Sequence, residues 1–375
     1  HAATSWPKPP QVLEAWARFH REVAGSPGRG AHAGSLEATR RVERVRRELT
    51  DLLGGADARR CVFTPSCTHA MNLAFHGALR PGDHAIATAL DHNAALRPLA
   101  AMEAEGRIAL TIVDASRDGF VSPDAIRAAV RPATRLVVAT HAGNAFGTIQ
   151  DVAAFAEIAH AAGARVLLDA AQSAGVIPID ARALGADLVA VPSHKSLLGP
   201  AGAGALLVAP DVDLAPDRFG GTGMDSTSLT PPVAWPASFE PGTGNAAGVV
   251  AWGEGIRVAT EDGLAAVAAH ERSLLARLEA GLAAIPRVTR YATRDLERRV
   301  GVLSCSVEGH DPAEVAAILD ASFGIAVRAG VLCAPRAAAA VGAPASGFVR
   351  ISVGRTTTPA DVDAAIDALR AIAEA

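Results

Sequence analysis

Lysine is almost absent from this chain of 375 residues: Lys8 and Lys195 are the only two, and the other 33 cationic side chains are arginine. Aromatic residues make up only 4% of the chain, and its four cysteines lack CxxC or other metal-ligand spacing. This spacing excludes a disulfide scaffold and a zinc site, and we expect no metal. No apolar run reaches the ~20 residues of a membrane-spanning helix, and the first residues do not resemble a secretory signal.

The chain is weakly acidic, and its charges are not concentrated in one segment. The net charge is −4, without a basic patch, which argues against nucleic acid and anionic membranes as partners. Half of the residues are apolar, and at ~100–200 residues per domain the length suggests two domains. We therefore expect a soluble, cytoplasmic α/β protein of two domains. The charged run 40–49 is expected to be the solvated face of an amphipathic helix.

The scarcity of lysine draws attention to the two that are present. Arginine stays protonated at any usable pH, whereas a lysine amine can lose its proton and act as a nucleophile. Lys8 lies in a proline-rich segment and is expected at the surface. Lys195 follows an apolar strand and precedes a glycine-containing turn, which makes it the first candidate for chemistry.

Short apolar runs alternate with helical patterns between residues 61 and 208. This alternation predicts βαβ units and a mostly parallel sheet covered on both faces. The expected strands are 84–88, 108–113, 136–140, 165–169, 187–191 and 205–208, and the expected helices are 68–79, 93–105, 123–129 and 151–162.

The pattern changes after the Pro/Gly-rich stretch 219–245. A long helical region is expected over 246–284, followed by strand 301–307, helix 311–322, strand 348–353 and helix 359–372. These elements predict a small α+β domain. Cys61 and Cys305 lie within apolar strand patterns and are expected in the core.

Polar residues follow several of the predicted strands, where open α/β sheets bind ligands. A helix that opens near Thr68 offers free backbone N–H groups, which suit a phosphate. The strand ends carry Asp169 with Gln172, then Ser193, His194 and Lys195, then His141 with Asn144, and finally Asp91, His92 and Asn93.

A lysine, an aspartate and a phosphate-binding helix start are what pyridoxal phosphate requires. The lysine forms a Schiff base, and the aspartate keeps the pyridine nitrogen protonated so that the ring can accept electrons.

Several segments resemble the cysteine desulfurase and selenocysteine lyase family, within the class V aminotransferase group. The resemblance rests on Asp169-Ala170-Ala171-Gln172, Ser193-His194-Lys195, Asp91-His92-Asn93, the segments 2–9, 28–30 and 239–245, Arg328 to Pro335, and Val349-Arg350-Ile351-Ser352. It implies the fold of fold-type I pyridoxal phosphate enzymes. In that fold a mostly parallel seven-stranded sheet is sandwiched by helices in a large α/β domain, beside a smaller α+β C-terminal domain.

The resemblance also implies a role for each matching residue. Lys195 would bind pyridoxal 5′-phosphate and move protons at the substrate Cα, and Cys333 would accept sulfur from L-cysteine as a persulfide. At the cofactor ring, His92 would lie on the ring face, Asp169 at the ring nitrogen and Gln172 at the 3-oxygen. The phosphate would be bound by four residues, Cys67, Thr68, Ser193 and His194. Asn144 would also contact the cofactor. Asn144 and Arg350 would hold the substrate carboxylate.

A homodimer with a shared active site is implied as well, in which Gly242 and Thr243 of one protomer reach the phosphate of the other. The implied organisation is an N-terminal segment 1–20 packing with the small domain, a large domain 21–258 and a small domain 259–375. A sulfur-acceptor protein is a further implied partner. The chain has Leu332 where the family usually has a histidine next to the cysteine, which predicts slow thiol chemistry at Cys333.

Other functions remain open on the sequence. A C–S lyase that eliminates from an S-substituted cysteine, or another class V reaction, would use the same cofactor. A nucleotide-dependent dehydrogenase lacks support because no GxGxxG follows a first strand. A cofactor-free scaffold would leave Lys195 and Asp169 without a purpose.

Overall fold

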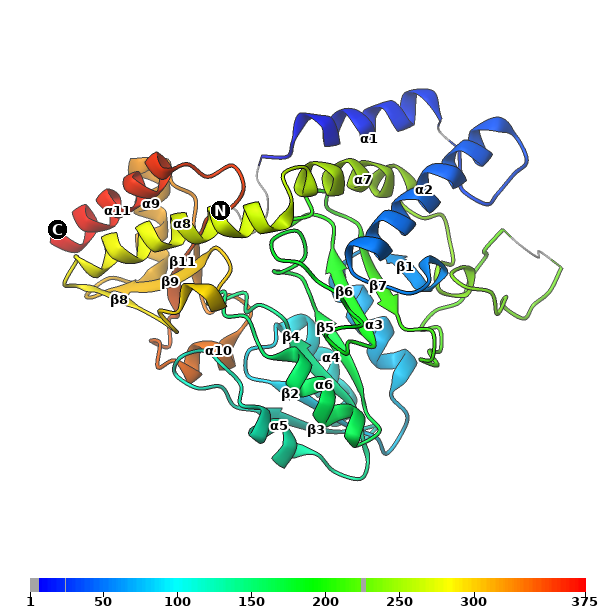
Figure 1. Cartoon of the computed structure of the whole chain (residues 1–375), viewed down its shortest axis with the longest axis horizontal. Helices are drawn as coiled ribbons and strands as arrows, with labels where there is room; N and C mark the ends of the chain where they lie inside the picture. Colours follow the sequence, from blue (N-terminus) through cyan, green and yellow to red (C-terminus); the bar gives the residue numbers. More distant parts are fainter. Residues whose placement is uncertain (1–6, 24, 224–226) are drawn as a thin grey trace.

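A seven-stranded sheet forms the centre of the computed structural model, which describes residues 7–23, 25–223 and 227–375 (Figure 1). The strand order is β1-β7-β6-β5-β4-β2-β3, and β7 is antiparallel to both of its neighbours. The strands are β1 (Cys61–Thr64), β2 (His84–Thr88), β3 (Ala109–Val113), β4 (Thr134–Thr140), β5 (Arg165–Asp169), β6 (Leu188–Pro192) and β7 (Gly204–Val208). The mostly parallel α/β fold that the sequence predicts is confirmed.

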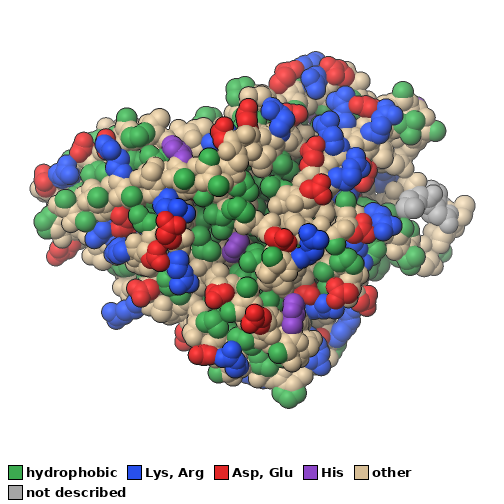
Figure 2. Space-filling view, in the orientation of Figure 1, with side chains coloured by type: hydrophobic (Ala, Val, Ile, Leu, Met, Phe, Trp, Pro, Cys, Tyr) green, Lys and Arg blue, Asp and Glu red, His purple; other side chains and the backbone are tan. Residues whose placement is uncertain are grey.

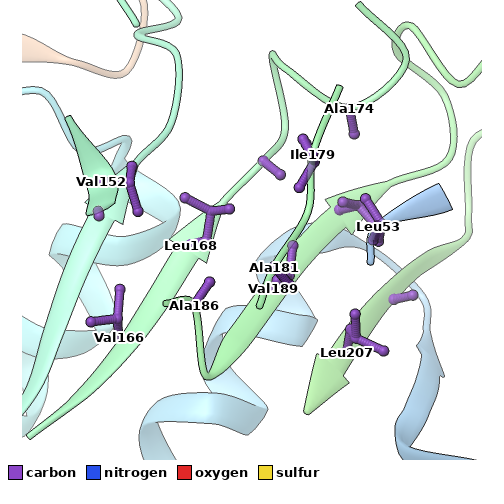
Figure 3. Packing of buried hydrophobic residues seen from close by; sticks show 14 of the residues in the cluster. Leu53, Val152, Val166, Leu168, Ala174, Ile179, Ala181, Ala186, Val189 and Leu207 are labelled. Carbon is purple, nitrogen blue, oxygen red and sulfur yellow. The ribbon is translucent and has the colours of Figure 1, made fainter. Parts of the chain in front are cut away.

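Helices cover both faces of this sheet. One face packs against α3 (Cys67–Ala78) and α4 (Asn93–Ala104), and the other against α2 (Ala33–Leu52), α5 (Pro123–Ala129), α6 (Val152–Ala161) and α7 (Ala246–Thr260). Successive residues of a strand point to opposite faces. In β5, Val166 and Leu168 therefore join one apolar cluster, whereas Leu167 joins the other. Figure 3 shows Val166 and Leu168 on the same side as Val189 of β6 and Leu207 of β7.

A second, antiparallel sheet of four strands carries the C-terminal part of the chain, in the order β10-β11-β9-β8. Its strands are β8 (Val288–Arg290), β9 (Val302–Val307), β10 (Arg328–Gly330) and β11 (Phe348–Ser352). The helices of this part are α8 (Leu264–Ala283), α9 (Pro312–Phe323), α10 (Pro335–Ala340) and α11 (Pro359–Glu374). Helices α8, α9 and α11 contribute to an apolar cluster on this sheet, which is the expected small α+β unit (Figure 1).

The predicted strands of the large sheet agree with the structure within two residues at each end. The expected helical region 246–284 is divided into α7 and α8, because Gly263 takes a left-handed conformation with φ 80° at the break. Strands β8 and β10 and helix α10 were not predicted, since segments of three to six residues show no measurable periodicity. Cys61 and Cys305 are fully buried, as expected.

The charged run 40–49 forms part of α2, but the prediction that it is a solvated face is wrong at Arg46. This side chain is buried, and its guanidinium nitrogens Nη1 and Nη2 donate to the two carboxylate oxygens of Glu240 at 2.6 and 3.0 Å. Arg46 also lies over the ring of Phe63, at 4.5 Å from its centroid. A bidentate ion pair satisfies a guanidinium that burial would otherwise penalise.

The N-terminal helix α1 (Pro10–Glu22) lies along α7, where Val12 and Ala15 pack against Ala251 (Figure 1). The segment before it, including Lys8, lies nearer to the small unit and lines a groove with residues of β11 and α11. Residues 1–6 of the expected N-terminal motif lie outside the described residues. The domain limits 1–20, 21–258 and 259–375 stay predictions.

The surface mixes both signs of charge, and Figure 2 shows acidic and basic side chains interspersed over the visible face. Among the described residues, no helix combines the length and apolar character that crossing a membrane demands. The same residues contain no group of three or more His, Cys, Asp or Glu side chains arranged to hold a metal ion.

Candidate active site

A cavity of about 300 Å³ lies at the carboxyl ends of the central strands. It is bordered by loops that follow β1, β2, β4, β5 and β6, and by β10, β11 and the turn after β10. Ten of the twelve predicted site residues line it: Cys67, Thr68, His92, Asn144, Asp169, Gln172, His194, Lys195, Cys333 and Arg350.

The two remaining predicted residues lie elsewhere. Ser193 is buried directly before His194, but its hydroxyl faces the backbone carbonyls of Pro200 and Ala203. Thr243 is exposed in the loop before α7 and does not border the cavity of its own chain. A contact between Thr243 and the cavity would therefore have to come from a second protomer.

Lys195 and Asp169 both line the cavity, and their opposite charges attract each other. Asp169 ends β5, and its Oδ1 accepts a hydrogen bond from the backbone N–H of Ala171 at 2.9 Å. Burial raises the pKa of the Asp169 carboxyl, and the positive charge of Lys195 opposes this rise. Burial also lowers the pKa of the Lys195 amine, against the attraction of Asp169. The cavity thus holds an amine whose neutral, nucleophilic form is more accessible than in water.

The N-terminus of α3 points at the same cavity. Ser66 caps the helix by accepting from the backbone N–H of His69 at 3.1 Å, which leaves the N–H groups of Cys67 and Thr68 unpaired among the described residues. A Cβ atom at Gly204 would lie 2.7 Å from the backbone nitrogen of Cys67, so glycine is needed for β7 to approach this helix. Free N–H groups and the helix dipole form a binding site for an anion.

His92 borders the cavity at the start of α4. Its Nδ1 accepts a hydrogen bond from the backbone N–H of Ala94 at 2.9 Å, which assigns the ring proton to Nε2. Burial lowers the pKa of His92, so the ring is neutral at pH 7. The preceding Asp91 holds this turn in place: its carboxylate accepts from the backbone N–H groups of Thr88 at 2.6 Å and Thr140 at 3.0 Å.

Two of the other predicted cofactor ligands are neutral groups at the cavity. Gln172 is buried, three residues after Asp169. Burial, together with the nearby charge of Lys195, lowers the pKa of His194 to about 4. A neutral imidazole and a carboxamide can each donate a hydrogen bond without adding charge to the site.

Arg350 brings a buried positive charge to the cavity from β11. Its Nη1 donates to the backbone carbonyl of Asn144 at 3.0 Å, and its Nε has no hydrogen-bond partner among the described residues. Burial and the neighbouring Arg328 lower the pKa of Arg350 to about 10, so it stays protonated at neutral pH. A buried guanidinium with an unpaired donor is a binding site for a carboxylate.

Arg328 is a cavity residue to which the sequence reasoning assigned no role. It stands opposite Arg350 in the pairing of β10 with β11, an arrangement of like charges that an anion between them would relieve. No acidic side chain of the described chain forms an ion pair with either arginine. Arg328 lies in a strand of three residues, which is too short to show periodicity in the sequence.

Cys333 lies in a tight turn between β10 and α10 and is the one exposed cysteine of the four. Leu332 and Cys333 both adopt left-handed conformations, with φ of 53° and 59°, which are unfavourable for residues other than glycine. Two hydrogen bonds hold the turn: Asn144 Nδ2 donates to the Leu332 carbonyl at 2.8 Å, and the Asn93 N–H donates to the Cys333 carbonyl at 2.9 Å. The Leu332 side chain is buried in the main apolar cluster.

Comparison with known proteins agrees with this geometry. The model of the aminotransferase class-V family matches residues 1–365. A probable cysteine desulfurase of Methanothermobacter thermautotrophicus is 36% identical over 338 residues, covering 89% of this chain and 84% of that protein. A cysteine desulfurase of Klebsiella pneumoniae is 32% identical, covering 99% of this chain and 92% of its own.

Solved structures give the same result. The apo structure of a cysteine desulfurase from Thermococcus onnurineus matches with a TM-score of 0.92 at 29% identity, covering 98% of this chain and 92% of that one. The cysteine desulfurase CsdA of Escherichia coli matches with a TM-score of 0.88 at 27% identity, with the same coverages. The resemblance seen in the sequence is confirmed, and the chain belongs to the aminotransferase class-V family.

Proposed function

We propose that this protein is a pyridoxal phosphate-dependent cysteine desulfurase, which converts L-cysteine to L-alanine and passes the sulfur to Cys333. The observation that carries the proposal is the meeting of Lys195, Asp169, Arg350 and Cys333 at one cavity. The first two suit the cofactor, the third suits an amino-acid carboxylate, and the fourth supplies a thiol. The cysteine desulfurases that the chain resembles support this reading.

The residues present fit pyridoxal 5′-phosphate. The unpaired N–H groups of Cys67 and Thr68 suit its phosphate, with His194 as a further donor. Asp169 would pair with the ring nitrogen, Gln172 with the 3-oxygen, and the neutral ring of His92 would lie on the ring face. Once bound to Lys195, the cofactor supplies an electron sink for the substrate Cα.

The chain's own residues would orient the substrate and move its protons. Arg350 would hold the carboxylate in two hydrogen bonds, which fixes both the position and the plane of the amino acid. Lys195 would take the proton from Cα and return one later. The Cys333 thiolate would then attack the substrate sulfur, so that an S–S bond forms while the bond from sulfur to Cβ breaks. The electron pair of that bond stays with the carbon skeleton of the substrate, whose Cβ is protonated to give alanine. Cys333 is left as a persulfide.

Asn144 makes two contacts in the structure in addition to the role expected for it. Its side-chain amide holds the Leu332 carbonyl, and its backbone carbonyl accepts from Arg350. We infer that Asn144 positions the Cys333 turn relative to the carboxylate site, with its side-chain oxygen left for the cofactor or substrate.

A homodimer with a shared active site belongs to the same proposal. The described residues before α7, 219–223 and 227–245, include Thr243 and the largely exposed apolar side chains of Phe219, Leu229 and Val233. Part of this segment projects from the body of the molecule (Figure 1). A second copy that covers these side chains would bring Thr243 to the cavity of its partner. A sulfur-acceptor protein and a cytoplasmic location complete the proposal.

The test is a product assay on the wild type and Cys333→Ala with L-cysteine. We expect the wild type to form alanine and a persulfide on Cys333, detected by thiol labelling and peptide mass spectrometry. Cys333→Ala should lose both products and still change the cofactor spectrum on binding cysteine. Val331→Ala, in the same exposed turn, serves as the matched control and should behave like the wild type.

The second candidate function is a C–S lyase, which the buried apolar Leu332 beside the thiol favours. A lyase would release pyruvate and ammonia and would tolerate Cys333→Ala. Unchanged turnover with pyruvate as product would therefore contradict the desulfurase and establish the lyase.

A further inference from the structure

Lys8 does not lie free at the surface as the sequence suggested; its amine donates a hydrogen bond to the backbone carbonyl of His194. The two residues are 186 positions apart in the chain, and His194 directly precedes Lys195. The two lysines of this sequence are thus connected through one peptide carbonyl.

Three successive carbonyls of the turn that carries Lys195 each accept a hydrogen bond. The Ser193 carbonyl accepts from the backbone N–H of Gly199 at 2.8 Å, and the Lys195 carbonyl accepts from that of Leu198 at 2.9 Å. The donor to the carbonyl between them is the Lys8 amine. The first two bonds lie within the turn, whereas the bond from Lys8 joins the turn to the N-terminal segment.

Close backbone packing restricts the same turn from two further directions. A Cβ atom at Gly175 would lie 2.6 Å from the Ser196 carbonyl oxygen, and one at Gly255 in α7 would lie 2.6 Å from the Leu197 carbonyl oxygen. Neither contact leaves room for a side chain. These contacts restrict the turn at Ser196 and Leu197, and the bond from Lys8 restricts it at His194, directly before the residue that must reach a cofactor with defined geometry.

Lys8 itself does not border the cavity of Lys195. It lines a separate groove with Ser196 and Leu198, on the side of the small unit. Partial burial of the Lys8 amine lowers its pKa to about 8. Lys8 can therefore act on the site through the turn, and its positive charge also contributes to the lowered pKa of His194.

We infer that Lys8 is a positioning residue for Lys195, which holds the His194 carbonyl so that the Lys195 amine is presented to the cofactor. This inference rests on the proposed role of Lys195. Without the donor, the partly buried His194 carbonyl would lose its hydrogen bond, and the turn would sample other conformations.

The test compares Lys8→Met, which keeps the stem and removes the donor, with Lys8→Arg, which keeps a charged donor. The full chain is freed of cofactor, pyridoxal phosphate is added, and its attachment is trapped by borohydride and located by peptide mass spectrometry. The presence of only two lysines makes this assignment unambiguous. Arg18→Met, which removes an exposed cation from α1, is the matched control.

We expect attachment at Lys195 to be about tenfold slower in Lys8→Met, at an unchanged melting temperature of the cofactor-free chain. Lys8→Arg and Arg18→Met should attach the cofactor at the wild-type rate. A wild-type rate in Lys8→Met, or an equally slow rate in Lys8→Arg, would overturn the inference. Absence of attachment at Lys195 in the wild type would instead disprove the proposed function.

Discussion

Replacement of Arg350 by lysine tests how the site recognises an amino acid. Arg350 is buried on β11 and donates to the Asn144 carbonyl at 3.0 Å, and its Nε has no hydrogen-bond partner in the part of the chain that the structure describes. Lysine keeps the positive charge but has no planar pair of donors, so it can attract a carboxylate without fixing its plane. The cofactor contacts expected for Lys195 and Asp169 do not involve this side chain.

The magnitude follows from the pairing that is lost. Truncating one partner of a buried, hydrogen-bonded charge pair costs about 2–5 kcal/mol. Because lysine retains the charge, we expect the lower part of this range, about 2–3 kcal/mol, which corresponds to roughly 30- to 150-fold in kcat/KM. The loss should appear with any α-amino acid, since all of them present the same carboxylate.

The assay measures kcat/KM for L-cysteine together with the absorbance spectrum of the bound cofactor. Arg350→Lys should keep the spectrum and lose activity, and its activity toward an amine without a carboxylate should change little. Arg336→Lys, an exposed arginine of the nearby helix α10, is the control and should match the wild type.

Two results would refute this reasoning. Near wild-type kcat/KM in Arg350→Lys would show that the carboxylate binds elsewhere, with Arg328 as the next candidate. Loss of the cofactor spectrum would show that Arg350 maintains the structure of the site rather than binding the substrate.

Three further predictions concern Lys195, Glu271 and Leu332. Lys195→Ala and Lys195→Arg should both lose the spectrum of the attached cofactor and all turnover, because no other lysine lines the cavity of the described chain; substantial activity in either would contradict the assignment. Burial raises the pKa of the Glu271 carboxyl to about 7, so the folded state holds its proton more tightly than the unfolded state. Stability should therefore fall by about 3 kcal/mol as the pH rises from about 4.5 to 7, and Glu271→Gln should remove most of this slope in thermal melts. Leu332→His should lower the free energy of unfolding by about 1–3 kcal/mol without accelerating sulfur transfer, because it places an imidazole in the apolar cluster; a faster enzyme of equal stability would disprove this.

Most of the fold and the cofactor side of the site could be predicted from the sequence. The strands of the large sheet are short apolar runs between capped helices, and the polar residues at their ends meet because parallel strands share one edge. This pattern predicts that Asp169, Lys195 and His92 lie close together, and the structure places all three at the cavity. The roles of these residues remain predictions.

The contacts between distant segments could not be predicted in the same way, because no local pattern records them. Arg46 appeared to belong to a solvated charged face, yet its partner Glu240 lies 194 residues away. Arg328 lies in a strand too short to show periodicity. The Lys8 amine donates to the backbone carbonyl of His194, and a backbone acceptor cannot be recognised from the type of its residue. Arg46 and Lys8 are each satisfied by a group that only the fold brings near, whereas the fold places Arg328 opposite a second arginine, Arg350.

Leu332 shows why such contacts bear on the chemistry as well. From the sequence, a leucine in place of histidine next to Cys333 means the loss of a proton donor or acceptor. In the structure the same leucine is packed in the main apolar cluster and anchors a turn whose two left-handed residues are unfavourable by themselves. Burial of Leu332 and the hydrogen bonds from Asn144 and Asn93 offset this strain and keep Cys333 exposed at the cavity. Leu332 thus cannot exchange a proton with the thiol, but its packing holds the turn that places Cys333 at the cavity.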